Sequence, residues 1–422
     1  MWSRKRIDIG WRDLWFAARN SLGRGDRDTA QGTAEQAWSS ENDTLACLSV
    51  RSGFDLLWTE LNLPAGSEIL MSAVTIRDMA RVVEEHGLVP VPVDLNPSTM
   101  APDPDLIRKA ITPHTRAIVV AHLFGAILDL TQVATIAKEH GLLLIEDCAQ
   151  AFDGHRYPGH AGSNVVMFSF GPIKTATALA GGLLVVRDPP LLARMRTTHA
   201  TWPEQTQGEF LRRVRTYSML KLISGRLAFG CLVTACRMLR RDYDAMLNGA
   251  VRNFPVEGFF ASLRRQPCAG LFKLLARRIT TFDTERQDAR AALGKLVEAA
   301  IQDGTSRVRS SAPVATAFEI LIPSSGANRH TWWVFPICVP NAEPVIRALR
   351  AEWFDATCGS QLQPIPAPAD RPELTATRAA EVVRQMMFLP FYPEMNDAAA
   401  ARMGQIVPEV LARCTLPRSG GT

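Results

Sequence analysis

A single lysine interrupts an otherwise uncharged stretch of the sequence. Lys174 lies within FSFGPIKTATALAGGLLVV, residues 168–186, where every other side chain is apolar, small or a hydroxyl. A solvated lysine needs no such surroundings, and a buried lysine without a partner costs several kcal/mol. The remaining interpretation is that the nitrogen of Lys174 does chemistry.

Polar groups also follow other apolar runs. LLLIEDCAQAF carries Glu146 and Asp147 directly after four apolar residues, and Gln150 three residues later. Ser169 ends the run that precedes Lys174. In an open α/β sheet, ligands bind at the carboxyl ends of the strands, which is where these side chains are expected. An acid at the end of a buried strand is costly unless it is paired.

The sequence SVRSGFD, residues 49–55, is a candidate anion site. It carries an apolar strand into a helix, and the first N–H groups of a helix bind phosphate. We expect Ser52 to be the N-cap of this helix, with Asp55 completing a weak capping box.

A lysine, an acid and an anion site together suit pyridoxal 5′-phosphate (PLP). Its aldehyde condenses with a lysine amine, its phosphate takes N–H donors, and its pyridine nitrogen takes an acidic partner. The acid keeps that nitrogen protonated, and the lysine serves as the general base. The residues therefore predict a PLP site.

Strands and helices alternate from residue 45, which predicts an α/β fold with a largely parallel sheet covered on both faces. From about residue 290 the pattern changes to that of a smaller α+β domain. Predicted strands are 45–50, 68–72, 89–95, 116–124, 142–147, 164–170, 181–188, 332–339 and 386–393, and predicted helices are 51–63, 75–87, 103–111, 130–141, 289–301, 342–353 and one from 397.

We predict four parts along the chain. They are an N-terminal arm and linker (1–44), a large PLP-binding domain (45–204), a basic helical insertion and connection (205–290) and a small C-terminal domain (291–422).

Within the insertion, residues 211–241 hold eight basic residues and no acidic one. We interpret them as a solvated basic face over packed apolar residues, with contact to an anionic part of a substrate or to a membrane surface as alternatives. Its run of ten apolar residues, 227–236, is too short to span a bilayer. The basic residues are Arg212, Arg213, Arg215, Lys221, Arg226, Arg237, Arg240 and Arg241.

The composition is that of an ordinary globular enzyme. The chain has 422 residues, 47% hydrophobic and 21% charged, with a formal net charge of +5. We predict no nucleic-acid partner, because the charge is mild and no recognition motif is found. The eight cysteines are scattered without zinc spacing, so we predict reduced thiols, no metal site and a cytoplasmic location.

The N-terminus is basic but lacks the continuous apolar stretch of a signal peptide. One helical face gathers apolar residues, which predicts docking on the rest of the chain or on a partner subunit. An anchor on a membrane surface is the less favoured alternative. The residues of this face are Trp11, Leu14, Trp15, Ala18 and Leu22. The sequence after it, GRGDRDTAQGTAEQ, is predicted to be a polar linker.

The spacing of these motifs resembles the DegT/DnrJ/EryC1/StrS family of aminotransferases. LLLIEDCAQAFDG is followed 27 residues after Asp147 by Lys174 in FSFGPIK. RSGFDLLWTELNLPAGSEILMSAVT and LPFYPEMND are also similar to family stretches. The resemblance covers about 45–190 well and 330–412 loosely, and it implies the PLP-dependent transferase fold of type I.

The resemblance also implies residue roles. Lys174 corresponds to the lysine that forms the Schiff base with the cofactor, and Asp147 to the partner of the pyridine nitrogen. Gln150 corresponds to a glutamine against the ring, and Ser169 to a phosphate ligand. Ser52, Gly53 and Phe54 align with the family's phosphate-binding turn, and Ile76 with a position beside the ring.

Three departures from the family pattern bear on these roles. Phe54 replaces a threonine, which leaves only a backbone N–H for the phosphate. Ile76 replaces an aromatic residue that usually stacks on the ring. KTATALAGG replaces an acidic, glycine-rich stretch after the lysine. We expect these changes to weaken cofactor binding or to reshape the substrate side.

The implied activity is transfer of an amino group, from glutamate as the expected donor, to a keto or aldehyde group of a sugar, expected to be nucleotide-linked. The implied assembly is a homodimer. Two alternatives stay open. One is another PLP-dependent reaction on a cyclitol, lipid-linked or aromatic precursor, and the other is a non-catalytic PLP-binding protein.

Overall fold

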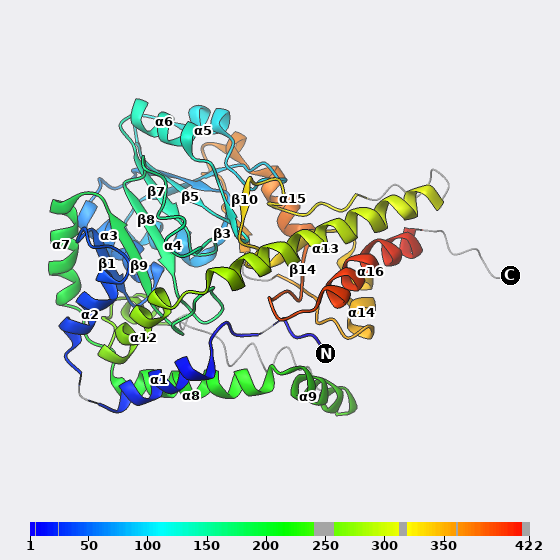
Figure 1. The fold of residues 1–422 in the computed structure, drawn as a ribbon. Coiled ribbons are helices and arrows are strands. Elements are labelled where there is room, and N and C mark those ends of the chain that lie inside the picture. The colour runs from blue at the N-terminus through cyan, green and yellow to red at the C-terminus, as the bar shows by residue number, and fades with distance from the viewer. Residues whose placement is uncertain (5, 24, 240–256, 312–318, 360–361, 416–422) are drawn as a thin grey trace.

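A computed structural model describes the whole chain except residues 5, 24, 240–256, 312–318, 360–361 and 416–422 (Figure 1). The helices are α1 Trp11–Leu22, α2 Arg27–Gln36, α3 Val50–Leu61, α4 Arg77–Glu85, α5 Pro104–Ala110, α6 Thr131–Glu139, α7 Pro189–Ala200, α8 Gln207–Ile223, α9 Arg226–Met238, α11 Phe259–Leu263, α12 Ala269–Thr280, α13 Thr284–Ser311, α14 Ala342–Ala351, α15 Thr377–Gln385 and α16 Asp397–Thr415, with a short 3₁₀ helix at Pro372–Leu374.

The strands are β1 Thr44–Cys47, β2 Glu68–Ser72, β3 Val74–Ile76, β4 Val89–Val93, β5 Thr115–Ala121, β6 Ala126–Ile127, β7 Leu143–Asp147, β8 Val165–Ser169, β9 Gly182–Val186, β10 Arg329–His330, β11 Phe335–Cys338, β12 Thr357–Cys358, β13 Leu362–Pro364 and β14 Met386–Leu389.

Seven strands form the central sheet in the order β1-β9-β8-β7-β5-β2-β4. Every neighbouring pair among β8, β7, β5, β2 and β4 is parallel, and β9 alone runs against both of its neighbours. The predicted α/β class with a mostly parallel sheet is therefore confirmed. Because the carboxyl ends of the parallel strands share one edge, residues that follow them are brought together there.

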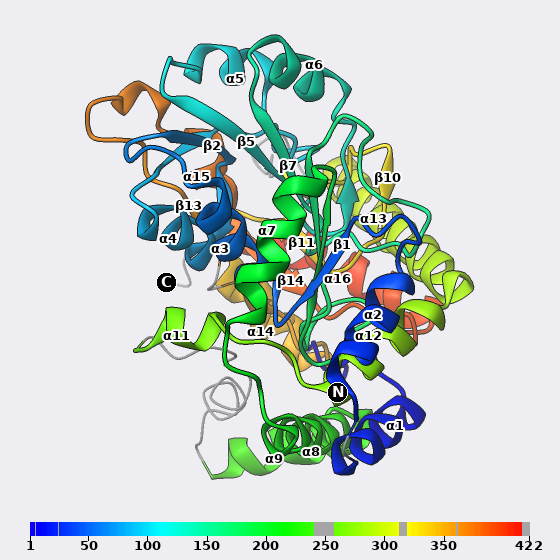
Figure 2. The same ribbon diagram turned by 90° about the vertical axis from the view of Figure 1, so that its left-hand side faces the viewer.

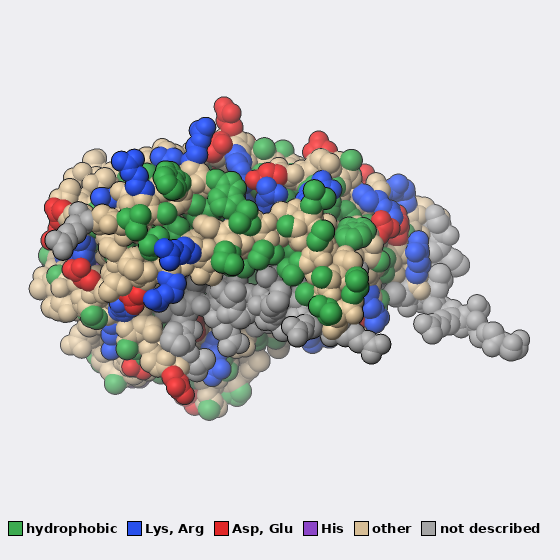
Figure 3. Space-filling view, turned by 90° about the horizontal axis from the view of Figure 1, so that it is seen from below, with side chains coloured by type: hydrophobic (Ala, Val, Ile, Leu, Met, Phe, Trp, Pro, Cys, Tyr) green, Lys and Arg blue, Asp and Glu red, His purple; other side chains and the backbone are tan. Residues whose placement is uncertain are grey.

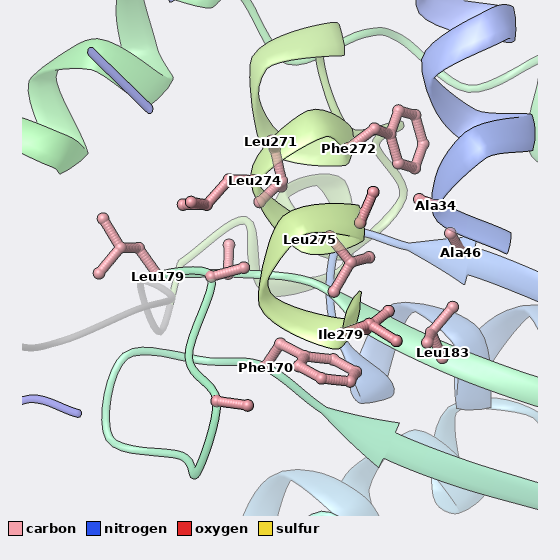
Figure 4. Packing of buried hydrophobic residues seen from close by; sticks show 14 of the residues in the cluster. Ala34, Ala46, Phe170, Leu179, Leu183, Leu271, Phe272, Leu274, Leu275 and Ile279 are labelled. Atoms are coloured by element: carbon pink, nitrogen blue, oxygen red, sulfur yellow. The ribbon is translucent and has the colours of Figure 1, made fainter. Parts of the chain in front are cut away.

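Helices cover both faces of the sheet (Figures 1 and 2). The buried side chains of α3, α4 and α7 pack on one face. On the other face α5 and α6 cover one half of the sheet, and α2 and α12 cover the half that carries β8 and β9. Figure 4 shows this last cluster, in which Leu275 and Ile279 of α12 lie close to Phe170 and Leu183.

The C-terminal part builds a second core from the three-stranded sheet β11-β14-β12 and the helices α13, α14 and α16. Two strands from this part return to the large domain. β10 pairs with β6, and β13 pairs with β3, where Leu362 lies opposite Ile76. Helix α13 runs unbroken through residue 290, where the sequence predicted a domain boundary.

The predicted polar linker contains a helix, so that prediction was wrong. In α2, Asp26 is the N-cap, and Ala30 and Ala34 are buried one turn apart. The only feature of the sequence that could have predicted this helix is a pair of alanines at i and i+4 in a polar stretch. These two small side chains are enough for α2 to pack on α12.

The N-cap of α3 also differs from the prediction. The N-cap is Ser49, whose hydroxyl accepts a hydrogen bond from the Ser52 N–H, so α3 begins at Val50. Asp55 makes no capping box, because it is buried and paired with Arg264 and His86.

The predicted docking face of α1 is only partly correct. Leu14 is buried, but Trp11, Trp15 and Leu22 are exposed. Asp13 faces inward instead, because it pairs with Arg277 and Arg278 of α12. Two half-buried charge-assisted hydrogen bonds thus favour the orientation in which Asp13 faces the protein.

Candidate active site

Three of the predicted site residues lie at one edge of the sheet. Asp147 ends β7 and Ser169 ends β8, and Met167 of β8 lies opposite Asp147 in the ladder. The chain then turns back towards β9, and Lys174 lies in this turn. A Cβ built on Gly171 would lie 3.7 Å from the Ser169 Oγ and 3.8 Å from the Lys174 Cγ, so both side chains lie beside Gly171.

The turn that carries Lys174 is fixed at both ends. The Lys174 N–H donates to the Gly171 carbonyl at 3.0 Å. Phe170 and Leu179 on either side are fully buried against α12, as Figure 4 shows. Thr175, next to the lysine, accepts a hydrogen bond from Arg290 Nη1 of α13 at 3.1 Å. The lysine is thereby held by the large domain and by the helix that leads into the small one.

Lys174 and Asp147 are electrostatic partners in a desolvated place. Burial lowers the pKa of Lys174 to about 8, which the charge of Asp147 opposes and that of Arg51 reinforces. Burial raises the pKa of Asp147. Smaller effects lower it, among them the hydrogen bond from the Ala149 N–H to the Asp147 Oδ1 at 3.0 Å, and the charge of Lys174. Both residues are half-buried. A lysine with so low a pKa supplies a neutral amine near physiological pH.

Two arginines that the sequence analysis did not assign to the site belong to it. Arg51 lies in the first turn of α3, where its guanidinium pairs with Asp78. Its charge also lowers the pKa of Arg213, after the larger effect of burial. Arg213 lies on α8 and donates to the Leu179 carbonyl at 2.9 Å. The basic insertion thus contributes one half-buried cation, Arg213, near this edge of the sheet.

Trp333 is a third residue near Lys174 that the sequence analysis did not assign to the site. The Lys174 Nζ lies 4.1 Å from the centroid of its ring, and the Trp333 Nε1 donates to the Ile173 carbonyl at 2.8 Å. The pairing of β10 with β6 brings this segment to the site, with Thr331 N bonded to the Gly125 carbonyl at 2.7 Å. An aromatic face beside a cation is a stabilising contact.

Gln150 is oriented by the chain after β5. Its Oε1 accepts the Phe124 N–H at 2.9 Å. The fully buried His122 beside it accepts the Leu128 N–H with Nδ1, so its Nε2 carries the proton that it donates to Glu146 at 3.0 Å. Both ring nitrogens of His122 are therefore engaged within the protein, which is typical of a structural histidine.

The remaining predicted residues take other positions. Ser52 and Gly53 lie in α3, and their N–H groups are already bonded to the Ser49 Oγ and carbonyl. A Cβ on Gly53 would lie 2.1 Å from Leu184, so this glycine is needed for the close packing of α3 on β9. Phe54 is fully buried in the core beside Trp58. Ile76 pairs with Leu362 and packs on the core under α4.

Comparison with known proteins shows that part of the chain is similar in sequence to aminotransferases. Residues 26–219 match the model of the DegT/DnrJ/EryC1/StrS aminotransferase family. An L-glutamine:2-deoxy-scyllo-inosose aminotransferase of Streptomyces kanamyceticus is 40% identical over 161 residues, which are 36% of this chain and 37% of that protein. A dTDP-3-amino-3,4,6-trideoxy-alpha-D-glucose transaminase of Streptomyces venezuelae is 37% identical over 169 residues, 38% of this chain and 44% of that protein. The matches thus span less than half the length of these relatives.

The solved structures extend the likeness to the whole fold. The aminotransferase TlmJ of Streptoalloteichus hindustanus superposes with a TM-score of 0.63 at 18% identity, over 98% of this chain and 100% of that one. The fold is therefore that of these aminotransferases, as the sequence predicted. Over residues 26–219, somewhat less than half of its length, the chain is thus similar to the DegT/DnrJ/EryC1/StrS aminotransferases.

Proposed function

We propose that this protein is a PLP-dependent aminotransferase that moves an amino group from an amino acid to a carbonyl group of a sugar or cyclitol. The observation that carries the proposal is the pair Lys174 and Asp147, a lysine with a pKa of about 8 beside a desolvated carboxylate at the strand ends. The family match and the names of the two relatives give the reaction class and the kind of acceptor.

The chemistry of these residues fits PLP. Lys174 would hold its aldehyde, and Asp147 would hold its ring nitrogen through Oδ2, since Oδ1 is taken by the Ala149 N–H. The Ser169 hydroxyl and Arg51, at the start of α3, would hold the phosphate, because the N–H groups of Ser52 and Gly53 are already bonded to Ser49. When bound, PLP supplies an electron-withdrawing ring that stabilises negative charge on the carbon that carries the amino group.

The protein supplies the proton transfers. Lys174 Nζ takes a proton from the donor substrate and returns one to the acceptor, because a pKa near 8 suits both directions. Asp147 keeps the ring nitrogen protonated. Gln150, fixed by Phe124, and Trp333, fixed by Ile173, limit where a substrate can lie around the lysine.

We propose the chemical class of the donor and of the acceptor from the names of the relatives. Glutamate is the donor that the family resemblance implies. Glutamine is a second candidate donor, because it appears in the name of one relative. A nucleotide-linked sugar and a free cyclitol are both carbonyl acceptors of this class. We also propose a homodimer, since Ile173 is 54% exposed directly beside Lys174 and a partner subunit would cover it.

Transfer of nitrogen tests the proposal directly. The PLP-loaded protein is incubated with glutamate or glutamine labelled with ¹⁵N and with a keto-cyclitol or a nucleotide-linked keto-sugar. We expect labelled amine in one acceptor. Cofactor binding without transfer to any carbonyl acceptor would instead identify the protein as a non-catalytic PLP-binding member.

The pH dependence of cofactor uptake gives a test that does not need a substrate. Only a neutral amine adds to an aldehyde, and burial lowers the pKa of Lys174 from 10.5 to about 8. We therefore expect the rate of PLP uptake to rise with pH and to level off above about 8. The absorbance change on mixing cofactor-free protein with PLP measures this rate. A rate that continues to rise through pH 9 and 10 would show that the pKa of Lys174 is close to the ordinary lysine value of 10.5.

A further inference from the structure

The helices α1, α8 and α9 form one side of the molecule and expose many large apolar side chains. Figures 1 and 2 place the three helices together below the large domain, and Figure 3 views this side, where hydrophobic side chains gather with Lys and Arg among them. We call this surface the α1/α8/α9 face. Its exposed large apolar residues are Trp11, Trp15, Leu22, Met219, Leu222, Leu227 and Met238, with Trp353 at the edge.

Cations accompany these apolar residues on each helix. On α8 the exposed positions Arg212, Arg215, Met219 and Leu222 follow one another at helical spacing, so a single stripe mixes arginine with apolar groups. Arg12 and Arg19 accompany the tryptophans of α1 in the same way, and Arg226 opens α9.

Among the described side chains of the three helices, no Asp or Glu is exposed. Asp13 is buried against Arg277 and Arg278, and the half-buried Glu209 is paired with Arg265.

The opposite faces of these helices already hold them on the protein. Leu14 and Ala17 of α1 are buried with Phe210 and Val214 of α8. Phe229, Val233 and Cys236 of α9 pack together with Met1. Because the inner faces alone dock the helices, the folding of this chain does not account for an outer face where Trp15 is 72% exposed and Leu227 is 87% exposed.

The helices lie along the surface and do not cross a membrane as single segments. Among the described residues, no single helix is long and apolar enough to span a bilayer. Residues 207–223 and 226–236 together have that length and composition, but they meet at an angle of 84°. A basic, apolar pair of helices bent in this way suits the plane of a membrane interface.

We propose that the α1/α8/α9 face docks on the surface of an anionic lipid bilayer. Tryptophan favours the level of the lipid headgroups, leucine and methionine enter the acyl region, and arginines bind lipid phosphates. A second copy of this chain is a poor occupant, because a two-fold contact through this face would set arginines against arginines without an acid between them. This proposal does not depend on the proposed function.

Flotation with vesicles tests the proposal. Full-length protein is mixed with vesicles of phosphatidylcholine alone or with phosphatidylglycerol at about one third, at about 0.1 M salt. We expect binding to the anionic vesicles and much less to the neutral ones. Arg212→Glu with Arg215→Glu should weaken binding by about 25-fold or more, since each cation accounts for about fivefold. Trp11→Ala with Trp15→Ala should weaken it to a similar degree.

A matched control separates the face from the net charge. Arg108→Glu with Lys109→Glu makes the same change of charge on exposed residues of α5, at the opposite side of the molecule, and should leave vesicle binding unchanged. The unfolding temperature shows that all variants are folded. The proposal fails if wild-type protein does not float with anionic vesicles, if the α5 control loses binding equally, or if the variants change the oligomeric mass while vesicle binding stays the same.

Discussion

Replacing Lys174 with alanine is expected to abolish amino-group transfer and to remove the site at which PLP attaches to the protein. The amine is the only group that combines a pKa of about 8 with the neighbouring Asp147, among the residues that the structure describes. A positioned general base alone contributes about 10²–10⁴-fold to rate. Loss of the nucleophile adds to this, so we expect a fall of at least about 10³-fold.

Mass spectrometry identifies the attachment site independently of activity. Wild-type protein loaded with PLP, reduced with borohydride and digested should carry the adduct on the peptide that contains Lys174. Lys138→Ala, which removes an exposed lysine from α6, is the matched control and should keep both the adduct and the activity. An adduct on any other lysine would refute the assignment.

The sheet and the core of the site were predictable because their signals are local. Each parallel strand is a short apolar run, and the groups that do chemistry stand directly after such runs, as Asp147 and Ser169 do. The setting of Lys174 could also be read from its neighbours in sequence, because a turn between two buried strands is apolar on both sides.

The rest of the site depends on contacts between distant parts of the chain. Trp333 donates its hydrogen bond to Ile173, which is 160 residues away in the sequence, and no periodicity in the sequence predicts this contact. Arg213 has seven basic companions in its segment, and only packing turns it inwards. The start of α3 was misplaced because SVRS offers two serines at helical N-cap positions, and the early end of β1 at Cys47 decides between them.

The basic insertion shows a similar limit. Its composition predicted a basic face, but the sequence could not say which residues would face outward. The structure turns Arg213 into the protein and leaves Arg212 and Arg215 exposed. Arg240 and Arg241 lie outside the described residues, as does the side chain of Arg237, so the test of this segment is placed on Arg212 and Arg215.

Replacing Asp147 with asparagine is expected to preserve the fold and cofactor attachment but to slow amino-group transfer by a few hundred-fold. The carboxylate holds a proton on the ring nitrogen, and a neutral amide of the same shape does not. An electrostatic partner of this kind is worth about 3–4 kcal/mol at the transition state. The decisive readings are kcat in a two-substrate assay and, by reduced-adduct mass spectrometry, the fraction of Lys174 that carries PLP.

The neighbouring carboxylate provides the comparison. Glu146 accepts hydrogen bonds from His122, from Tyr157 at 2.7 Å and from the His160 N–H at 2.7 Å. Burial raises its pKa, but these partners, with His122 the strongest, lower the pKa to about 2. Its charge therefore stabilises the fold near neutral pH, and that contribution is lost as the pH falls towards 2.

The two substitutions should consequently differ in whether they change the stability of the fold or kcat. Glu146→Gln weakens a buried hydrogen-bond network and should lower the free energy of unfolding by a few kcal/mol, because the amide nitrogen cannot accept a hydrogen bond and a buried donor left without an acceptor is costly to the fold. Asp147→Asn removes a carboxylate whose pKa burial already raises, so the unfolding temperature should change little while kcat falls. If Asp147→Asn instead lowers the unfolding temperature and leaves kcat near that of the wild type, Asp147 is a structural acid and does not partner the ring nitrogen.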